Sequence, residues 1–394
     1  MGPQDEGRAP VVALPSEVEA ALEILAKQLR QEPLVQSSLV AMNTAKLLRT
    51  VVSKMAIQGM DVCLEAIRIV GRRLHRASEL AFVVENTVRR VLRIAREEFQ
   101  LALLRHQRER QSTEGLRTDE SAVPVNIASE FAQLSTSDSF RRNLADIMDG
   151  DEMRQGVNTI SAVCRSARKA MIEAVLEYEN EIETTSDNIV EQALAHIHAN
   201  EVILTYGWSV TVELFLLEAA KKRHFEVIVA EAAPSCKGQG LARKLASTAE
   251  NGGSLDVTVI PDSAVFAIMS RVHKVVVGAH AVMANGALLT ASGVHLMLGA
   301  AKMHAKPVIA CAGMYKLTPL FPHDRIALND LLSPESVASY AEVAHLDNVK
   351  VISPAFDVVP PEFVTLLITN TGGYNPSYIY RLLRDYYDDI DVQL

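Results

Sequence analysis

The sequence predicts an α/β protein in which an all-helical N-terminal domain precedes a doubly wound, mostly parallel sheet. Six short segments rich in Val and Ile lie in the second half of the chain, separated by helix-length stretches, whereas the first half shows helical periodicity. Continuous β-branched runs are typical of parallel strands buried on both faces and joined by helical crossovers. We therefore expect a Rossmann-like sheet with these strands: Glu201–Thr205, Phe225–Ala230, Val257–Ile260, Lys274–Val277, Pro307–Ala310 and Val349–Ile352.

The length of 394 residues is too great for one ordinary core and predicts two domains. The helical domain is expected at residues 15–199 and the α/β domain at residues 200–394. One helix of the first domain is indicated by five apolar residues at the 3.6-residue spacing of a single helix face: Val88, Val91, Leu92, Ala95 and Phe99.

Two segments are expected to lack regular structure. Residues 1–14, with Gly2, Pro3 and Pro10, read as a disordered tail. The stretch from about Arg108 to Ser121 is polar and poor in large apolar residues, so we expect an exposed insert between helices there.

Composition excludes several classes of protein. A net charge of -9 argues against a general nucleic-acid binder. No apolar run approaches the eighteen or so residues that span a bilayer, and the N-terminus lacks a secretory signal, so a cytosolic protein is expected. The four cysteines are scattered, with no C-x-x-C pair, so neither a disulfide framework nor a metal site is expected.

The ends of the expected strands carry candidate chemistry, because ligands of such sheets bind beyond the carboxyl ends of the strands. Glu231, Asp262, His280 and Cys311 could together form an acid/base site. The plain alternative is structural: carboxylates after strands often cap loop amides, and cysteine is often buried as a small hydrophobe. Strand-end positions alone leave both interpretations open.

A cofactor is not expected. Gly238-Gln-Gly240 follows the second strand, where a phosphate could meet a helix N-terminus. Arg243 stands where the dinucleotide fingerprint has its third glycine. A turn into a helix is therefore the favoured interpretation.

Two charged helix faces are candidate docking surfaces. Arg72, Arg73, Arg89 and Arg93 form a basic run, and a later helix carries acidic residues that include Glu173 and Glu177. Such runs are usually solvated faces, and docking of a charged partner is the sharper hypothesis.

Longer motifs make the sequence recognisable. They are Gly71-Arg-Arg73, Val88-Arg-Arg-Val-Leu92, His196–Leu204, Asn285-Gly286, Tyr315–Pro319, Pro354–Glu362 and Gly372–Arg381. Together they resemble the regulatory subunits of translation initiation factor 2B, and most specifically their beta branch, within a superfamily shared with sugar-phosphate isomerases. The resemblance spans nearly the whole chain.

The resemblance implies a degenerate catalytic pocket. The isomerases carry a catalytic Cys, a catalytic Asp and a phosphate-binding Arg, and the matching positions here are Gly207, His280 and Ala233. Neither glycine nor alanine can replace a nucleophile or a phosphate fork. Glu231 and Asp262 are then expected to be structural remnants, and the chain is expected not to be an enzyme. The alternatives are a divergent sugar-phosphate isomerase and a metabolite-sensing homodimer.

The resemblance also implies partners. Members of this family assemble with alpha, gamma, delta and epsilon subunits into a decameric exchange factor for initiation factor 2, with no direct nucleic-acid or membrane partner. Contact with the alpha subunit of initiation factor 2 is expected at Glu173 and Glu177, with the arginine run as a second candidate. Subunit contacts are expected at His198, Asn200, Asn375, Tyr378 and Tyr380.

Overall fold

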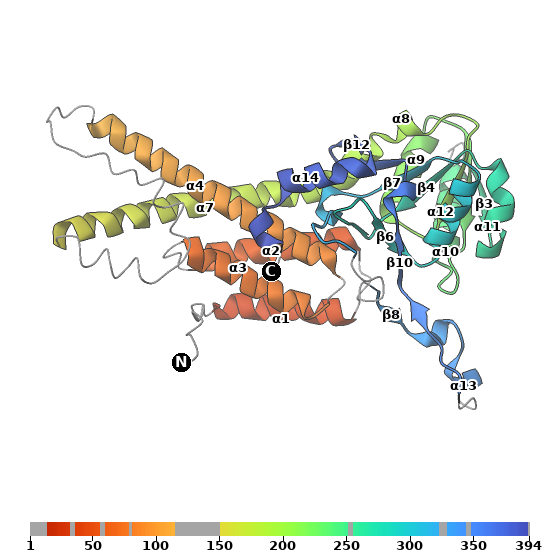
Figure 1. Cartoon of the computed structure of the whole chain (residues 1–394), viewed down its shortest axis with the longest axis horizontal. Coiled ribbons are helices and arrows are strands. Elements are labelled where there is room, and N and C mark those ends of the chain that lie inside the picture. The colour runs from red at the N-terminus through yellow and green to blue at the C-terminus, as the bar shows by residue number, and fades with distance from the viewer. Residues whose placement is uncertain are drawn as a thin grey trace, which may run out of the picture.

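The computed structural model describes residues 14–31, 36–55, 60–78, 81–114, 150–250, 255–322, 329–343 and 348–392. Figure 1 shows a helical body at one end of an elongated molecule and a sheet covered by helices at the other. The expected tail lies outside these residues except for Leu14.

The helical body consists of α1 (Ser16–Gln31), α2 (Ser37–Lys54), α3 (Met60–His75), α4 (Phe82–Glu114) and α7 (Gly150–Val190). The long helices α4 and α7 lie side by side, and α2 packs against both. The predicted apolar face of α4 is confirmed, because its five residues are all buried. A short helix, α8 (Ala193–His196), leads into the sheet.

The expected polar insert begins later than the sequence suggested. Helix α4 continues through Arg108 to Glu114, so the first part of the insert is helical. Arg, Gln and Glu are good helix formers, and a lack of apolar residues there indicates an exposed helix as readily as a loop. The remainder, residues 115–121, lies outside the described residues.

The predicted α/β class is confirmed by a seven-stranded sheet in the order β12-β11-β7-β4-β1-β2-β3. All neighbouring pairs are parallel except β11 and β12. The strands are β1 (Val202–Tyr206), β2 (Phe225–Ala230), β3 (Leu255–Ile260), β4 (Lys274–Gly278), β7 (Val308–Cys311), β11 (Leu366–Thr369) and β12 (Gly372–Tyr374). The longer covering helices are α9 (Val210–Ala220), α10 (Lys237–Glu250) and α12 (Val294–Met303), with the short α11 (Val265–Ile268) beside α12.

The sixth expected strand is wrong. Val349–Ile352 forms no strand, and Val349 and Ile352 are both 52% exposed. The sixth parallel strand is instead β11, whose Leu367 and Ile368 are buried against β7. β-branched residues favour a strand only where neighbouring strands receive them, and a single sequence does not reveal those neighbours.

Smaller elements complete the domain. β5 (Ala281–Val282), β6 (Leu288–Ala291) and β10 (Phe356–Val359) form a second antiparallel sheet. β8 (Leu331–Leu332) and β9 (Ser353–Pro354) pair at the base of a projection that carries α13 (Tyr340–Val343). The chain then returns through α14 (Ile379–Tyr386) and the 3-10 turn Asp389–Asp391 to α4.

Candidate functional site

The strand order places the expected pocket between β1 and β4. The chain runs from β1 outward to β2 and β3 and then crosses to β4 on the other side of β1. Ligands of doubly wound sheets bind at such a switch point, beyond the carboxyl ends of the strands. Gly207, Glu231, Asp262 and His280 lie just past the ends of β1, β2, β3 and β4.

The side chain of Tyr206, the last residue of β1, lies at this place. Tyr206 is only 9% exposed, and its hydroxyl lies 3.2 Å from Asp262 Oδ2. Burial, with a further contribution from the Asp262 charge, raises the pKa of this phenol well above its ordinary value. The hydroxyl therefore stays protonated and acts as a hydrogen-bond donor.

Asp262 is occupied by the loop that follows β2. Its Oδ1 accepts a hydrogen bond from the Ala232 amide at 3.0 Å, and its Oδ2 accepts one from the Ala233 amide at 2.8 Å, in addition to the Tyr206 hydroxyl. The backbone at Ala232 and Ala233 is thus held by a carboxylate. The role of Asp262 as a structural remnant stays a prediction.

A second carboxylate, that of Asp357, lies close enough to Tyr206 for its charge to act on the phenol. Asp357 Oδ2 accepts hydrogen bonds from the amides of Gly293 at 2.7 Å and His295 at 3.1 Å, at the start of α12. Gly293 has a φ of 99°, and a Cβ there would overlap the Tyr206 hydroxyl. Tyr206 and the glycine at the helix start therefore fit together as one packed unit.

The remaining candidates have further contacts in the structure. The His280 ring packs on Phe356, with ring centroids 4.6 Å apart, and its amide donates to Leu289 in the small sheet. Cys311 is fully buried within β7, and burial raises its pKa to about 12. The backbone of Glu231 holds the loop that follows β2. Its amide donates a hydrogen bond to the Ile260 carbonyl, and its carbonyl accepts one from the Gly238 amide. Gly207 has a φ of 59°, which suits glycine.

Two carboxylates, those of Asp262 and Asp357, accept hydrogen bonds from backbone amides, the Tyr206 phenol is a protonated donor, and the Cys311 thiol is buried. Over the described part of the chain, no three His, Cys, Asp or Glu side chains are grouped so as to hold a metal ion. None of the described helices is long and apolar enough to cross a membrane.

The acidic candidates lie on the surface of α7. Glu173 and Glu177 are exposed and four residues apart, which places them on one face. Lys169 Nζ lies 3.9 Å from Glu173, a loose surface pair. Leu176, between them, is 37% exposed, so the face is acidic with an apolar contact point.

The arginine run divides into two groups. Arg89 is 2% exposed and bonds Glu85 and the backbone of Asp391, while Arg93 donates to the carbonyls of Arg384 and Tyr387. These two hold the C-terminal segment, and burial argues against Arg89 as a docking residue. A solvated helix face and a face covered by a distant segment have the same sequence pattern.

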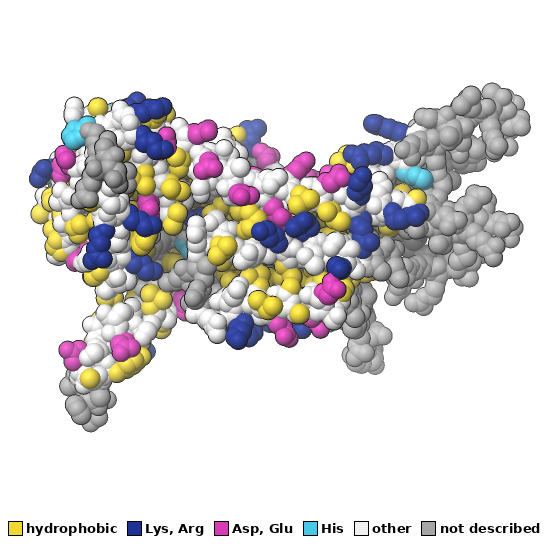
Figure 2. Space-filling model, turned by 180° about the vertical axis from the view of Figure 1, so that it is seen from behind, with side chains coloured by type: hydrophobic (Ala, Val, Ile, Leu, Met, Phe, Trp, Pro, Cys, Tyr) yellow, Lys and Arg dark blue, Asp and Glu magenta, His cyan; other side chains and the backbone are white. Residues whose placement is uncertain are grey.

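The second arginine group remains at the surface. Arg72 and Arg73 are more than 40% exposed and pair with Glu65 and Glu19. Figure 2 shows Lys and Arg side chains gathered toward the helical end of the molecule on the face opposite to that of Figure 1.

The expected subunit-contact residues lie in two segments, one just before β1 and one just after the edge strand β12. His198 and Asn200 are exposed just before β1, where Arg223 contacts the His198 ring at 3.0 Å. The Asn375 side chain caps the 3-10 turn after β12, because its Oδ1 accepts a hydrogen bond from the Ser377 amide. Tyr378 stacks on Tyr374 with centroids 5.6 Å apart, and Tyr380 is 56% exposed.

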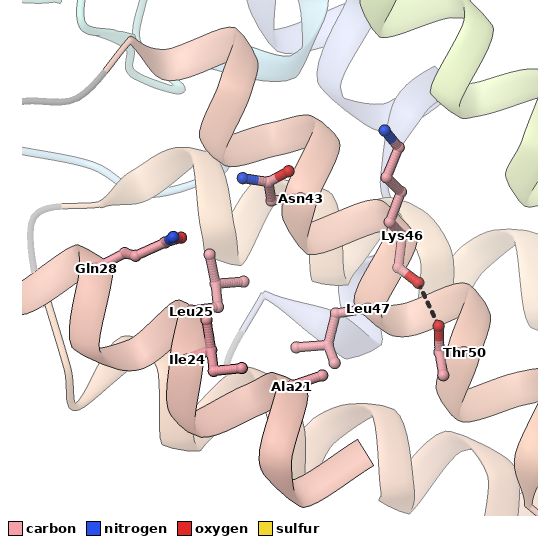
Figure 3. A pocket seen from close by; sticks show the side chains of 8 residues that line it. All are labelled: Ala21, Ile24, Leu25, Gln28, Asn43, Lys46, Leu47 and Thr50. Carbon is pink, nitrogen blue, oxygen red and sulfur yellow. Dashed lines mark hydrogen bonds between the residues drawn. The ribbon is translucent and has the colours of Figure 1, made fainter. Parts of the chain in front are cut away.

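An open groove of about 290 Å³ lies elsewhere, between α1 and α2 (Figure 3). It is lined by Ala21, Ile24, Leu25, Gln28, Asn43, Lys46, Leu47 and Thr50. Thr50 donates to the carbonyl of Lys46 within α2, so the polar lining is partly used by the helix itself. The groove belongs to the helical body and is not a strand-end site.

Comparison with known proteins agrees with this geometry. The family model for the initiation factor 2 subunit family matches residues 35–376. A Dictyostelium discoideum protein named translation initiation factor eIF2B subunit beta is 39% identical, covering 92% of this chain and 94% of its own length. A ribose 1,5-bisphosphate isomerase of Pyrococcus furiosus is 29% identical and covers 58% of this chain and 69% of its own length.

Solved structures show the same relationship. The crystal structure of eIF2B beta from Chaetomium thermophilum matches with a TM-score of 0.70 and 27% identity, covering 96% of this chain and 94% of that one. A chain of the tetrameric eIF2B-beta2-delta2 complex from the same organism matches with a TM-score of 0.65 and 27% identity, covering 94% and 95%. The match extends over both the helical body and the sheet, and the chain therefore belongs to the initiation factor 2 subunit family.

Proposed function

We propose that this chain is a non-catalytic regulatory and scaffolding subunit of the guanine nucleotide exchange factor for initiation factor 2. The observation that carries the proposal is the packing of Tyr206 against Asp262 and Gly293 at the strand ends, in a chain that matches eIF2B beta relatives over nearly its whole length. A pocket built around Tyr206 and Asp262 stabilises the fold, and exchange chemistry then belongs to other subunits.

The proposed partners are the alpha, gamma, delta and epsilon subunits of the same factor, in the cytosol. Members of one fold family can pair through equivalent surfaces, and a stable pair needs a well-packed interface of about 1,600 Å² in total. Our candidates for such contacts are His198 and Asn200, just before β1, and Asn375, Tyr378 and Tyr380, after β12. Exposed tyrosines supply apolar area and a polar tip together.

The proposed docking face for the alpha subunit of initiation factor 2 is the acidic surface of α7 at Glu173 and Glu177. Phosphorylation adds nearly two negative charges to a protein, so it changes docking on an acidic face by repulsion. This mechanism senses phosphorylation without any chemistry in this chain. Arg72 and Arg73, which remain exposed, are the second candidate, and there a phosphate would be attracted.

Charge reversal separates these two faces. Glu177→Lys should weaken binding of unphosphorylated initiation factor 2 by the intact complex and reduce the difference between its phosphorylated and unphosphorylated forms. Glu191→Lys is the matched control, because Glu191 is also exposed and stands fourteen residues further along, about 21 Å by helix rise. Unchanged binding in Glu177→Lys would remove the acidic face from the proposal and direct attention to Arg73→Glu.

The first test of the whole proposal is native mass spectrometry of the tagged chain purified from its own cells at low salt. Recovery in a decameric assembly with four other subunits is the expected result. A homodimer of about twice the 43.1 kDa chain mass, without other subunits, would contradict it.

The isomerase relative keeps two alternatives open to experiment, a divergent sugar-phosphate isomerase and a metabolite sensor. Both alternatives require the strand-end pocket to admit a ligand. Turnover of a phosphorylated pentose that is lost in His280→Ala would support the isomerase, and saturable binding without turnover would support the sensor.

A further inference from the structure

Three hydroxyl side chains in the sequence are followed directly by proline, and the structure separates one of them from the other two. The pairs are Thr318-Pro319, Ser333-Pro334 and Ser353-Pro354. A serine or threonine before proline is the acceptor pattern of proline-directed protein kinases. Thr318 is 0% exposed and Ser353 is 5% exposed, whereas Ser333 is exposed.

Ser333 lies on the projection that carries α13, residues 329–354, of which 329–343 and 348–354 are described. It follows β8 directly and stands at the N-cap of the 3-10 turn Pro334–Ser336. None of the described residues between Leu331 and Ile352 is buried, and the projection extends away from the body (Figure 1). A large enzyme can therefore reach the residues on both sides of this hydroxyl.

The backbone at Ser333 already has the extended form in which protein kinases bind an acceptor segment. Its φ of -53° and ψ of 127° are close to polyproline II values. Pro334 favours this form, because a proline ring disfavours the helical conformation of the residue before it. The strand before the serine, β8, has two residues paired with β9, so local opening around the site costs little free energy.

The hydroxyls of the three pairs differ in the same way as their burial. The Ser333 oxygen accepts a long, weak hydrogen bond of 3.4 Å from the Glu335 amide. The Ser353 side chain is buried within β9, where Ser353 pairs with Leu332. Thr318 is buried completely, and its hydroxyl accepts from the Leu320 amide at 3.5 Å. The fold, and not the dipeptide, therefore selects Ser333.

We propose that Ser333 is a phosphorylation site for a proline-directed protein kinase. Pro334 selects this class, because proline has no amide hydrogen to donate to the kinase and presents an apolar ring instead. In the reaction, Ser333 Oγ attacks the γ-phosphorus of a nucleoside triphosphate, and the bond from that phosphorus to the β–γ bridging oxygen breaks. The nucleoside diphosphate leaves, and the hydroxyl proton passes to the catalytic base of the kinase.

The modification changes the charge of the projection. Its described charged residues are Asp330, Glu335 and Glu342 against Lys350. A phosphoserine adds nearly two negative charges, so it roughly doubles the negative excess of this surface. The site goes beyond the proposed function and does not depend on it, because the exposure of Ser333 belongs to this chain alone.

Phosphopeptide mapping of the folded, full-length chain tests the site. The purified chain is incubated with a recombinant proline-directed kinase and ATP and is then digested with trypsin, which places the three pairs in separate peptides, 317–325, 326–350 and 351–381. We expect phosphate on Ser333 in peptide 326–350 at a rate about tenfold or more above the rates at Thr318 and Ser353, because opening a buried segment costs free energy. Synthetic peptides of the same three sequences show which pairs the kinase accepts without the fold. An unmodified Ser333, or equal rates at Ser333 and Ser353 in the folded chain, would overturn the proposal.

Variants test the acceptor and the kinase class separately. Ser333→Ala should remove the phosphate from peptide 326–350, and Pro334→Ala should lower its rate of formation by about tenfold or more, since one pocket contact is lost in the transition state. Ser336→Ala is the matched control, because Ser336 is also exposed and is followed by Val337. It should leave the rate unchanged. An unchanged rate in Pro334→Ala would contradict the kinase class, and loss of phosphate in Ser336→Ala alone would contradict the acceptor.

Mapping of the chain purified from its own cells, with phosphatase inhibitors present, tests the use of the site. Phosphate on Ser333 is the expected result, and a peptide 326–350 without phosphate would overturn a role in the cell. The same purification separates this result from the proposed function. Recovery without sister subunits counts against the proposed function, whatever the state of Ser333.

Discussion

Arg96 on α4 holds Asp391, 295 residues further along the chain, in a two-pronged ion pair. Arg96 Nη2 lies 2.6 Å from Asp391 Oδ1, and Arg96 Nη1 lies 2.5 Å from Oδ2. Asp391 is fully buried, and Arg68 adds a third contact at 3.2 Å. Arg89 donates to the Asp391 carbonyl at 3.2 Å. The C-terminal segment, which follows the last strand of the sheet, is thereby fastened to the helical body.

Asp391→Asn should destabilise the protein by about 3 kcal/mol, because it leaves Arg96 and Arg68 without their shared carboxylate in a buried place. Urea unfolding should show the loss as a lower midpoint, and chymotrypsin should cleave after Tyr386 or Tyr387 faster than in the unaltered chain. Asp389→Asn, at an exposed neighbouring residue, should stay within about 0.5 kcal/mol of the unaltered chain. Equal stability of the two variants would show that the ion pair does not hold this segment.

Gly293, which precedes α12, and Gly299, within α12, should respond oppositely to alanine. Gly293→Ala should cost about 2 kcal/mol or more, because φ is 99° and the added methyl would overlap the Tyr206 hydroxyl. At Gly299 nothing lies within 4 Å of an added Cβ, so Gly299→Ala should stabilise the helix by about 0.5 to 1 kcal/mol. Thermal unfolding of the two variants measures both signs.

The steric part of the Gly293 effect can be separated with Tyr206→Ala. If the tyrosine fills the pocket, the double variant should be more stable than the sum of the two single losses predicts, with a coupling of about 1 kcal/mol or more. Strict additivity would mean that Gly293 and Tyr206 do not compete for the same space.

The strands show how far the sequence could predict this fold. The segment Phe225–Ala230 was predicted with its observed bounds, because its buried Val and Ile run is a local signal. Val349–Ile352 carries the same signal but lies on the projection that carries α13, where neighbouring strands do not cover it. Leu366–Thr369 is a strand because β7 and β12 flank it. Such neighbours are fixed by topology, which the local pattern does not contain.

The sequence predicts where the candidate site lies in the fold, at the strand ends, but not which side chains contact one another there. Gly207 follows β1, at the switch point, and Asp262, which follows the edge strand β3, reaches the same region through the Tyr206 hydroxyl. That Tyr206 fills the space depends on Gly293 at the start of a later helix, a contact between distant segments. A glycine before an apolar helix was the available signal. The burial of Arg89 had no signal, since its partner lies 302 residues away.

Lys316 gives the chain a measurable dependence on pH. It is 7% exposed and donates from Nζ to the Ala279 carbonyl at 2.9 Å. Burial lowers its pKa from 10.5 to about 8, and the nearby Cys311 acts weakly in the opposite direction. Tyr315 and Cys311, the titratable neighbours, have their pKa values raised to about 12 by burial, so both stay neutral between pH 7 and 10.

Below pH 8 the folded and unfolded chains both hold the Lys316 proton, and the buried charge costs the folded state about 3 kcal/mol, the equivalent of a pKa of 8 against 10.5. Between pH 8 and 10.5 the folded state has released this proton while the unfolded chain keeps it, so the free energy of unfolding contributed by this group rises with pH. Lys316→Met removes the titration. The stability of the unaltered chain relative to this variant should therefore increase by about 2 kcal/mol from pH 7.5 to 9.5, as measured by urea unfolding. A difference that stays constant over that range would show that the folded state keeps the Lys316 proton as the unfolded chain does, so that burial does not lower this pKa, and a falling difference would show that the pKa is raised.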